Sequence, residues 1–562
     1  MLRSPLTPQA CPAPRNLSPS HPMSVAPSAP ATAPASPAAL LATPPRWLLP
    51  LVLTVAAVAF LPAMTMGFLG DDFVYVARFF SLPFSGWPRL FTHEWSDGIW
   101  GQPLKELRPF AALSFMIDAR VWGGWAPGHR LTNVLLHLAA TALVVRLAWR
   151  YSDGKTHAAL VAGLIFAVHP AHAETVAWIT GRADLFGSAA ALAFLVAAET
   201  FSAQGSRRPL LLALLALGIG VFTKEFCLIA PLLLVLRWAL LDPRAGRTVW
   251  IRRAQLFLGA LGVVALYALA RHAAFGRDTG NGFFGWNDAP AWNRQAGYWG
   301  WLIPILPFTT GHEWASPPAL SVLRNLWLTL AALTAAALPL ALTLGRNPTA
   351  ARALFFGGFW WFATTIGLFV VVYFSPRHLY LPSAGVAIGV GLALGCSRLR
   401  AVLAGGIILW CAAAHIAALR PWIEAGARSR DAIAALDADL AGADARTLAL
   451  ISVPETHGHI WLWAWSCPQA IGAPFLRHPV PAERVLERPI NYYNGDQWTK
   501  ARQPAAMVRA ASSAAILLVG TDGSIRHRLV PPDELQTRAA ALPAPGLTAQ
   551  NHTAFLESFF PR

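Results

Sequence analysis

Apolar segments of membrane-spanning length recur along the chain and restrict it to one class of fold. They lie at about residues 47–66, 130–149, 156–170, 185–202, 209–223, 226–241, 254–274, 323–345, 353–374, 381–397 and 400–419. A helix needs roughly 20 apolar residues to cross a bilayer. The chain is 55% hydrophobic and only 13% charged, which excludes an ordinary soluble globule. We therefore predict an α-helical polytopic membrane protein with about 11 transmembrane helices.

Composition divides the chain into three expected regions. Residues 1–45 are rich in Pro, Ala and Ser, which predicts a disordered cytoplasmic tail. Residues 46–420 hold the apolar segments and form the expected transmembrane domain. Residues 421–562 are expected to form a small soluble α/β accessory domain, with strands at 447–453 and 514–519 and a helix at 428–440. We assign its histidines and tryptophans, including His457, His459 and Trp461, to packing and surface positions.

Arginine placement sets the expected orientation. Clusters of Arg lie in alternate loops, at residues 146–155, 207–208, 244–253, 346–352 and 398–400. By the positive-inside rule these loops are cytoplasmic, so the N-terminus is inside and the C-terminal domain outside. We therefore attribute the net charge of +16 to membrane topology and to contact with lipid headgroups, and not to nucleic-acid binding. A tight outer turn at residues 223–225 keeps this alternation consistent.

Two adjacent carboxylates, Asp71 and Asp72, follow the first apolar segment at its predicted outer end. If this were the C-terminal turn of a helix, two acids there would oppose the helix dipole. Carboxylates beside a low-dielectric wall are costly to desolvate, so they more often serve chemistry, for example as a general base for a hydroxyl. We favour Asp71 as the base, because the first acid lies closer to the membrane and should be the more desolvated.

Three further polar clusters are predicted on the same face. One is the turn from His169 to Leu185, and the others contain Lys224-Glu225 and Arg377-His378. Guanidinium groups bind phosphate through two parallel hydrogen bonds, so converging cations beside paired acids suggest an anionic headgroup opposite a base. The supporting residues expected around this cavity are Arg108, Asn133, His137, His169, His172, Glu174, Asp184, Glu225, His378 and Tyr380.

Metal and cofactor sites are not predicted. His169, His172 and Glu174 could be read as metal ligands, but nothing in the sequence supplies a fixed geometry for them. The five cysteines contain no CxxC pair, so neither a disulfide framework nor a zinc site is supported.

Taken in order, these segments resemble the GT-C membrane glycosyltransferases, in particular the transmembrane and tetratricopeptide-repeat O-mannosyltransferases and their bacterial relatives. The resemblance covers about residues 67–385. The chain departs from it at Pro376 and His378, where the family has an acid and an aromatic residue, and the tetratricopeptide repeats are missing. The matching segments are Gly70 to Phe73, Arg108-Pro109, Leu131 to Asn133 with His137, His169 to Leu185, Lys224-Glu225 with Pro231, and Arg377 with Leu379 to Ser383.

The resemblance implies transfer of a sugar, with inversion, from a polyprenyl-phosphate donor to a hydroxyl acceptor at the outer face of a bacterial inner membrane. Asp71 or Asp72 would take the acceptor proton. Arg182, Lys224 and Arg377 would bind the donor phosphate. The expected partners are this lipid donor, a protein, lipid or glycan acceptor and membrane lipids, with no nucleic acid.

Two other functions fit a multi-span chain. A ligase or polymerase of surface polysaccharide would be expected to centre on Arg and His in a late loop, without an early pair of acids. A transporter would show repeated halves and polar residues at the bilayer midplane, whereas here the ionisable residues gather at one interface.

Overall fold

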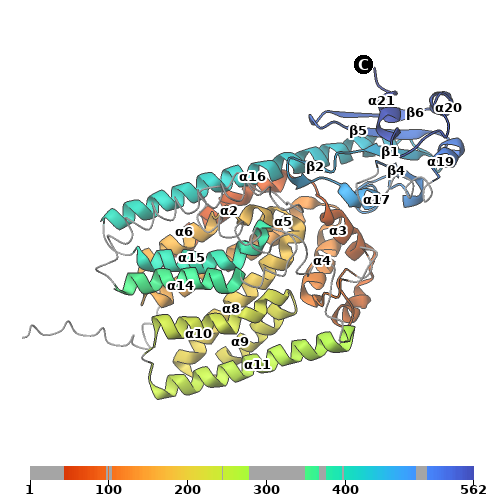
Figure 1. Ribbon diagram of the computed structural model, residues 1–562. Helices are drawn as coiled ribbons and strands as arrows, with labels where there is room; N and C mark the ends of the chain where they lie inside the picture. Colours follow the sequence, from red (N-terminus) through yellow and green to blue (C-terminus); the bar gives the residue numbers. More distant parts are fainter. Residues whose placement is uncertain are drawn as a thin grey trace, which may run out of the picture. The chain divides into compact units, whose positions relative to one another are not determined.

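The computed structural model describes most of the chain and is drawn in Figure 1. The described residues are 43–96, 99, 104–243, 245–276, 348–365, 375–394, 398–488 and 503–561. The predicted tail up to residue 45 and the apolar segment at 323–345 lie largely or wholly outside them. Within the described part, every other predicted apolar segment falls on a helix.

Long helices account for the apolar segments, since each can satisfy its backbone hydrogen bonds internally. Figure 1 labels them. Their bounds are α2 Leu48–Phe60 with η1 Leu61–Thr65, α5 Ala126–Tyr151, α6 Thr156–Ala167, α8 Arg182–Gln204, α9 Arg207–Val221, α10 Ala230–Leu241, α11 Arg247–Phe275, α14 Pro348–Thr365, α15 Tyr380–Ala393 and α16 Arg398–Leu440.

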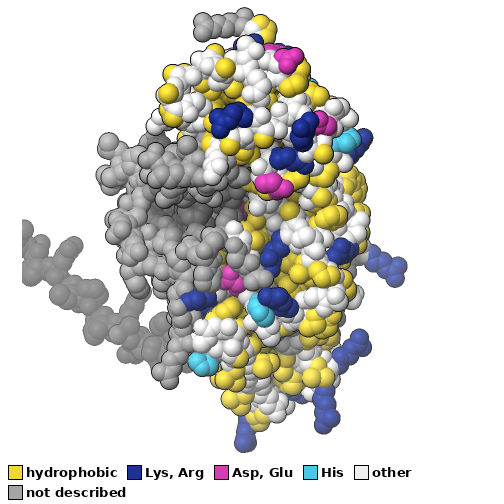
Figure 2. Space-filling view, turned by 90° about the vertical axis from the view of Figure 1, so that its right-hand side faces the viewer, with side chains coloured by type: hydrophobic (Ala, Val, Ile, Leu, Met, Phe, Trp, Pro, Cys, Tyr) yellow, Lys and Arg dark blue, Asp and Glu magenta, His cyan; other side chains and the backbone are white. Residues whose placement is uncertain are grey.

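Several of these helices meet the requirements for a membrane span. Among the described residues, five segments are long and apolar enough, namely Leu48–Thr65, Ala126–Tyr151, Ile179–Gln204, Arg247–Phe275 and Arg400–Leu440. Large apolar side chains such as Leu215, Leu258 and Leu409 are exposed on them and on α9, and Figure 2 shows hydrophobic side chains over much of the described surface between scattered charges. The chain is a multi-pass membrane protein, as predicted. The total of about 11 spans stays a prediction.

Small residues allow neighbouring helices to approach closely. Helices α14 and α15 run side by side (Figure 1). A Cβ atom added at Gly385 would lie 2.1 Å from Cγ of Trp360, and one at Gly389 would lie 2.7 Å from the carbonyl oxygen of Ala353. Only glycine fits these contacts, which is the usual basis of close helix packing in membranes.

Shorter helices connect the long ones at the end of the bundle where the predicted site residues lie. They are α3 Asp71–Ser81, η2 Phe84–Phe91, α4 Pro109–Trp122, α7 His172–Ala177, η3 Ile179–Gly181, η4 Glu225–Ile229 and η6 Pro376–Leu379. Helix α4 begins at Pro109, directly after Arg108. The tight turn predicted at 223–225 separates α9 from η4 and α10.

The C-terminal part contains a small mixed sheet. Its strand order is β4-β1-β5-β6, with β1 parallel to β4 and β5, and β6 antiparallel to β5. A separate hairpin is formed by β2 and β3. The strand bounds are β1 Leu448–Ser452, β2 Thr456–His457, β3 Ile460–Trp461, β4 Val485–Glu487, β5 Ala514–Val519 and β6 Ile525–Val530, and the helices are α17 Cys467–Ala470, α19 Pro504–Ala510, α20 Pro532–Ala540 and α21 His552–Glu557.

The predicted fold class, a helical membrane protein with a small C-terminal α/β region, is confirmed. One element differs from expectation. The helix expected at 428–440 is not separate, because α16 continues through Pro421 from the last apolar segment to Leu440. It therefore crosses the expected domain boundary at residue 420 without a break, and the exact division into domains stays a prediction.

Candidate active site

The turn from His169 to Leu185 is the hub of the site. It contains α7, η3 and the first turn of α8, and almost all of its residues are buried. Along its length it binds the Asp71-Asp72 segment, the Lys224 turn and the Arg377 turn, which are far apart in the sequence. The segment with the most specific family resemblance is therefore the one that brings the predicted site residues together.

Asp72 is fully buried and holds the hub in place. Its carboxylate accepts hydrogen bonds from the backbone N–H of Leu69 at 3.1 Å, and from the N–H and hydroxyl of Thr180 at 3.0 and 2.8 Å. Burial raises the pKa of Asp72 to about 6, although nearby Arg130 and these hydrogen bonds oppose the shift. The structure thus gives Asp72 a positioning role, and sequence reasoning missed its partner Thr180.

Asp71 lies beside it and is only half-buried. Both acids occupy the first turn of α3, so they sit at a helix N-terminus, where the helix dipole favours negative charge. The disfavoured alternative of a helix C-terminal turn is therefore not what the structure shows. The desolvation argument for Asp71 was wrong, because Asp72 is the more buried of the two. Asp71 keeps part of its surface exposed.

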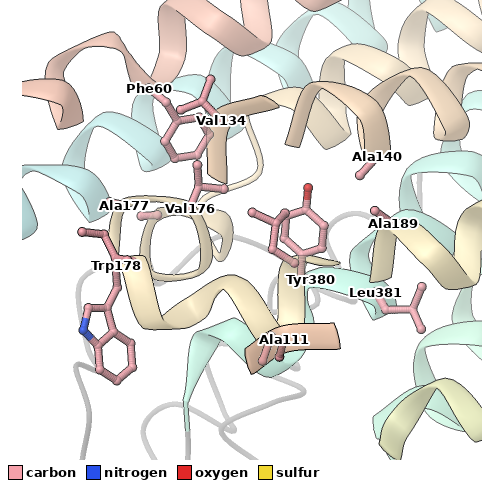
Figure 3. Close-up of a cluster of buried hydrophobic side chains, with 14 of the residues drawn as sticks. Phe60, Ala111, Val134, Ala140, Val176, Ala177, Trp178, Ala189, Tyr380 and Leu381 are labelled. Carbon is pink, nitrogen blue, oxygen red and sulfur yellow. The ribbon is translucent and has the colours of Figure 1, made fainter. Parts of the chain in front are cut away.

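Trp178 joins the two acids to the cations. Its indole N–H donates to the carbonyl oxygen of Leu69 at 3.1 Å, two residues before Asp71. The guanidinium carbon of Arg377 lies over the same ring, 4.9 Å from its centre. Figure 3 labels Trp178 and Tyr380 among the buried side chains of this region. One aromatic side chain thus contacts both the segment before the acids and a predicted phosphate ligand.

Two of the three predicted phosphate-binding cations belong to one group. Nζ of Lys224 lies 2.5 Å from Oδ2 of Asp184, and Nε of Arg377 lies 3.6 Å from the same oxygen. Arg377 also pairs with Glu174 at 3.5 Å. The side chains of Lys224 and Arg377 keep 14% and 13% of their surface exposed. Burial lowers the pKa of Lys224, while Asp184 opposes the shift.

Arg108 extends this group on the other side of Lys224. It pairs with Glu106 at 2.8 Å and with Glu225 at 2.9 Å. Burial raises the pKa of Glu106, and the neighbouring charge of Glu225 adds to the rise. Arg108 holds the pKa of Glu225 below its ordinary value in spite of burial. The sequence analysis missed Glu106. Its position two residues before Arg108 could have indicated an ion pair between them.

Arg182 lies apart from this group. Its side chain is fully buried and pairs with Asp118 at 2.7 Å. It also donates to Oδ1 of Asn133 and to the carbonyl oxygen of His129, both at 2.8 Å, and stacks on Phe115 at 4.6 Å. Among the described residues, the carboxylate that pairs with Arg182 therefore differs from those that pair with Lys224 and Arg377, and the phosphate-binding role of Arg182 stays a prediction. Its position suits a residue that orients α4, α5 and the hub.

Buried histidines lie within the hub and in helix α5 next to it. His137 makes a hydrogen bond of 2.6 Å with the hydroxyl of Tyr380, and His172 makes one of 2.8 Å with Ser383. Burial lowers the pKa of His169 to about 3 and that of His172 well below its usual value. These two imidazoles are therefore neutral at physiological pH. His378, in η6, is half-buried.

The residues that could be read as metal ligands have other roles in the structure. Within the part of the chain that the structure describes, no group of three His, Cys, Asp or Glu side chains has an arrangement that could hold a metal ion. His169, His172 and Glu174 instead have other neighbours, of which Ser383 and Ser375 are hydrogen-bonded to His172 and Glu174.

Comparisons with known proteins agree with the resemblance. No protein-family model matches the chain. Over 142 residues it is 41% identical to protein O-mannosyl-transferase Tmtc2 of Drosophila melanogaster, which covers 24% of this chain and 14% of that protein. Over 114 residues it is 40% identical to protein O-mannosyl-transferase TMTC2 of Mus musculus, which covers 19% of this chain and 13% of that protein. The matched segment is thus a small part of these relatives.

Solved structures were compared as well. ArnT from Cupriavidus metallidurans bound to undecaprenyl phosphate aligns with 88% of this chain and 94% of its own, at 14% identity and a TM-score of 0.47. The archaeal oligosaccharyltransferase AglB from Archaeoglobus fulgidus aligns with 91% of this chain and 77% of its own, at 12% identity and a TM-score of 0.39. The sequence matches confirm that the chain resembles the transmembrane O-mannosyltransferases over part of its length.

Proposed function

We propose that this protein is a membrane glycosyltransferase that moves a sugar from a polyprenyl-phosphate donor to a hydroxyl acceptor at the outer face of the membrane. The observation that carries the proposal is the hub from His169 to Leu185. Through Trp178 and Thr180 it links the Asp71-Asp72 segment to Arg377, which supports placing the proposed base and the proposed phosphate-binding group at one site. The partial match to O-mannosyl-transferases supports the same reaction class.

In this proposal Asp71 is the general base. It would accept the proton of the acceptor hydroxyl as that oxygen attacks the anomeric carbon of the donor sugar. The bond from the anomeric carbon to the phosphate oxygen breaks as the new bond forms, which inverts the configuration. Asp72 fixes the position of Asp71 through its bonds to Leu69 and Thr180.

The leaving phosphate would be bound by Lys224, Arg377 and Arg108. Each keeps some exposure, and each is already held by a buried or half-buried carboxylate. A phosphate entering this group would share the three cations with Asp184, Glu174 and Glu225 and gain charge-assisted hydrogen bonds. The lipid tail of the donor would remain among the apolar helices, which explains why this site is built at the end of a membrane bundle.

Donor consumption tests this proposal. Purified protein is incubated with a panel of polyprenyl-phosphate sugars and a hydroxyl-rich membrane extract, and release of sugar-free polyprenyl phosphate is followed by mass spectrometry. We expect release from at least one donor by the wild type and little from Asp71→Asn. Equal release in samples with and without protein would refute the proposal.

A further inference from the structure

The hairpin of β2 and β3 lies in the C-terminal region, which the sequence assigned to an accessory role. Thr456 pairs with Trp461 and His457 with Ile460. Gly458 has a φ of +58° in the two-residue turn, a conformation typical of tight hairpins. The turn therefore presents His459 at the tip of the hairpin.

One end of the hairpin docks on the segment before the acids. The backbone N–H of Gly70 donates to the carbonyl oxygen of Leu462 at 2.5 Å. A Cβ atom added at Gly70 would lie 3.4 Å from Cβ of Trp461, and Gly70 itself has a φ of +47°. Trp461 therefore lies against the residue that immediately precedes Asp71.

The segment that follows β3 is anchored to α16. The indole N–H of Trp463 donates to Ser429 of α16 at 2.9 Å, and the hydroxyl of Ser429 donates to the carbonyl oxygen of Phe68 at 2.6 Å. The ring of Trp463 also lies 6.0 Å from that of Phe73. The hairpin is therefore fixed both to α16 and to the segment that carries the acids.

The tip of the hairpin lies within electrostatic range of the phosphate end of the site. His459 interacts electrostatically with Glu174, the carboxylate that pairs with Arg377 at 3.5 Å and accepts a hydrogen bond of 2.7 Å from Ser375. Burial lowers the pKa of His459, with Glu174 opposing the shift. The imidazole is half-buried, and in its neutral form it offers one donor and one acceptor.

The hairpin thus contacts Gly70, beside the proposed base, and its tip lies within electrostatic range of Glu174, beside the proposed phosphate ligand. The group between a base and a departing phosphate is the transferred sugar. Resting on the proposed function, we propose that the hairpin covers this sugar, and that Trp461 and His459 contact it and determine which sugar is accepted. An indole ring suits the apolar face of a sugar, and an imidazole suits its hydroxyl groups.

Binding measurements distinguish a role of the hairpin in sugar recognition from a role in catalysis. The dissociation constants of sugar-loaded and sugar-free polyprenyl phosphate are measured on purified wild type, Trp461→Ala, His459→Ala and Arg377→Ala. We expect the wild type to prefer the loaded lipid. The two hairpin variants should lose about tenfold or more of that preference and keep their affinity for the sugar-free lipid, whereas Arg377→Ala should weaken both. His459→Gln should regain part of the preference.

Matched controls are Trp410→Ala, an exposed tryptophan of α16, and His478→Ala, an exposed histidine of the C-terminal region. Both should behave as the wild type. A donor with a photoreactive group on its sugar gives a second measurement that needs no variant, and it should label the peptide containing residues 455–463.

Two results would overturn the inference: an unchanged preference in both hairpin variants, or labelling confined to other peptides. The proposed function fails separately, if the wild type binds the loaded lipid with preference and yet transfers no sugar.

Discussion

Replacing Arg182 should mainly lower stability, whereas replacing Arg377 should mainly lower donor affinity, although the sequence analysis assigned both residues to phosphate binding. Arg182 is fully buried and bonds to Asp118, to Asn133 and to the carbonyl oxygen of His129. Arg182→Ala leaves the carboxylate of Asp118 buried without its cation. Breaking a buried pair in this way typically costs about 3–5 kcal/mol of stability.

Arg377→Ala should affect binding instead. Its pairing distances to Glu174 and Asp184, 3.5 and 3.6 Å, are longer than that of Arg182 with Asp118, 2.7 Å, and its side chain is partly exposed. Removing one charge-assisted contact to phosphate costs about 1.5–3 kcal/mol, which is roughly a 10- to 150-fold loss of donor affinity. Stability should change much less than in Arg182→Ala.

Both variants are compared by thermal unfolding in detergent and by donor affinity. The double variant Asp118→Asn, Arg182→Gln is the matched control, because it removes both buried charges and should recover part of the stability lost in Arg182→Ala. Arg182→Lys should recover only part as well, since an ammonium cannot reproduce the planar fork. An Arg182→Ala protein that melts like the wild type but no longer binds donor would refute this reasoning and return Arg182 to the phosphate-binding set.

Three further outcomes are expected. Asp71→Asn should lower turnover by about 10²–10⁴-fold while donor affinity is kept, as lost general-base catalysis requires; unchanged turnover measured on purified protein would exclude Asp71 as the base. The pKa of Asp72 is raised to about 6, so the contribution of this group to stability is complete below its ordinary pKa near 4 and is lost as the pH rises through 6. The unfolding free energy of the wild type, measured relative to that of Asp72→Asn, should therefore fall by about 2 kcal/mol between pH 4 and 7. A difference that does not change with pH would contradict this. Reporter fusions after Arg208 and after Arg420 should report opposite compartments, and a shared compartment would overturn the predicted topology.

The helical bundle could be predicted because hydropathy is a local property. Each described apolar segment became a helix, and the turn at Lys224 was visible as a short polar interruption. The continuity of α16 was not visible, because Pro421 normally ends a helix or kinks it. Here the helix passes through it and joins the apolar segment to the C-terminal region.

The candidate site shows where such reasoning stops. The sequence analysis identified Asp71 and Asp72 but predicted Asp71 to be the more buried. Asp72 is the more buried of the two, and its hydrogen-bond partner Thr180 lies more than a hundred residues away in the sequence. The sequence analysis placed Arg182 in one phosphate-binding set with Lys224 and Arg377. The partner of Arg182, Asp118, could not be identified from the sequence, because it lies in a different helix and only the tertiary fold brings the two residues together. His459 and Trp461, in the hairpin, match no motif. Trp461 lies against Gly70, and His459 is within electrostatic range of Glu174, only because the C-terminal region docks there.

The most direct test of the account is transfer of a labelled sugar in proteoliposomes. Purified wild type, Asp71→Asn and Arg377→Ala are reconstituted with a labelled polyprenyl-phosphate sugar, and the label in a hydroxyl acceptor is measured together with the sugar-free lipid released. The account predicts equal amounts of the two products for the wild type, slow transfer with donor still bound for Asp71→Asn, and weak donor binding for Arg377→Ala. Wild-type rates in both variants, or a labelled donor that remains intact with the wild type, would contradict it.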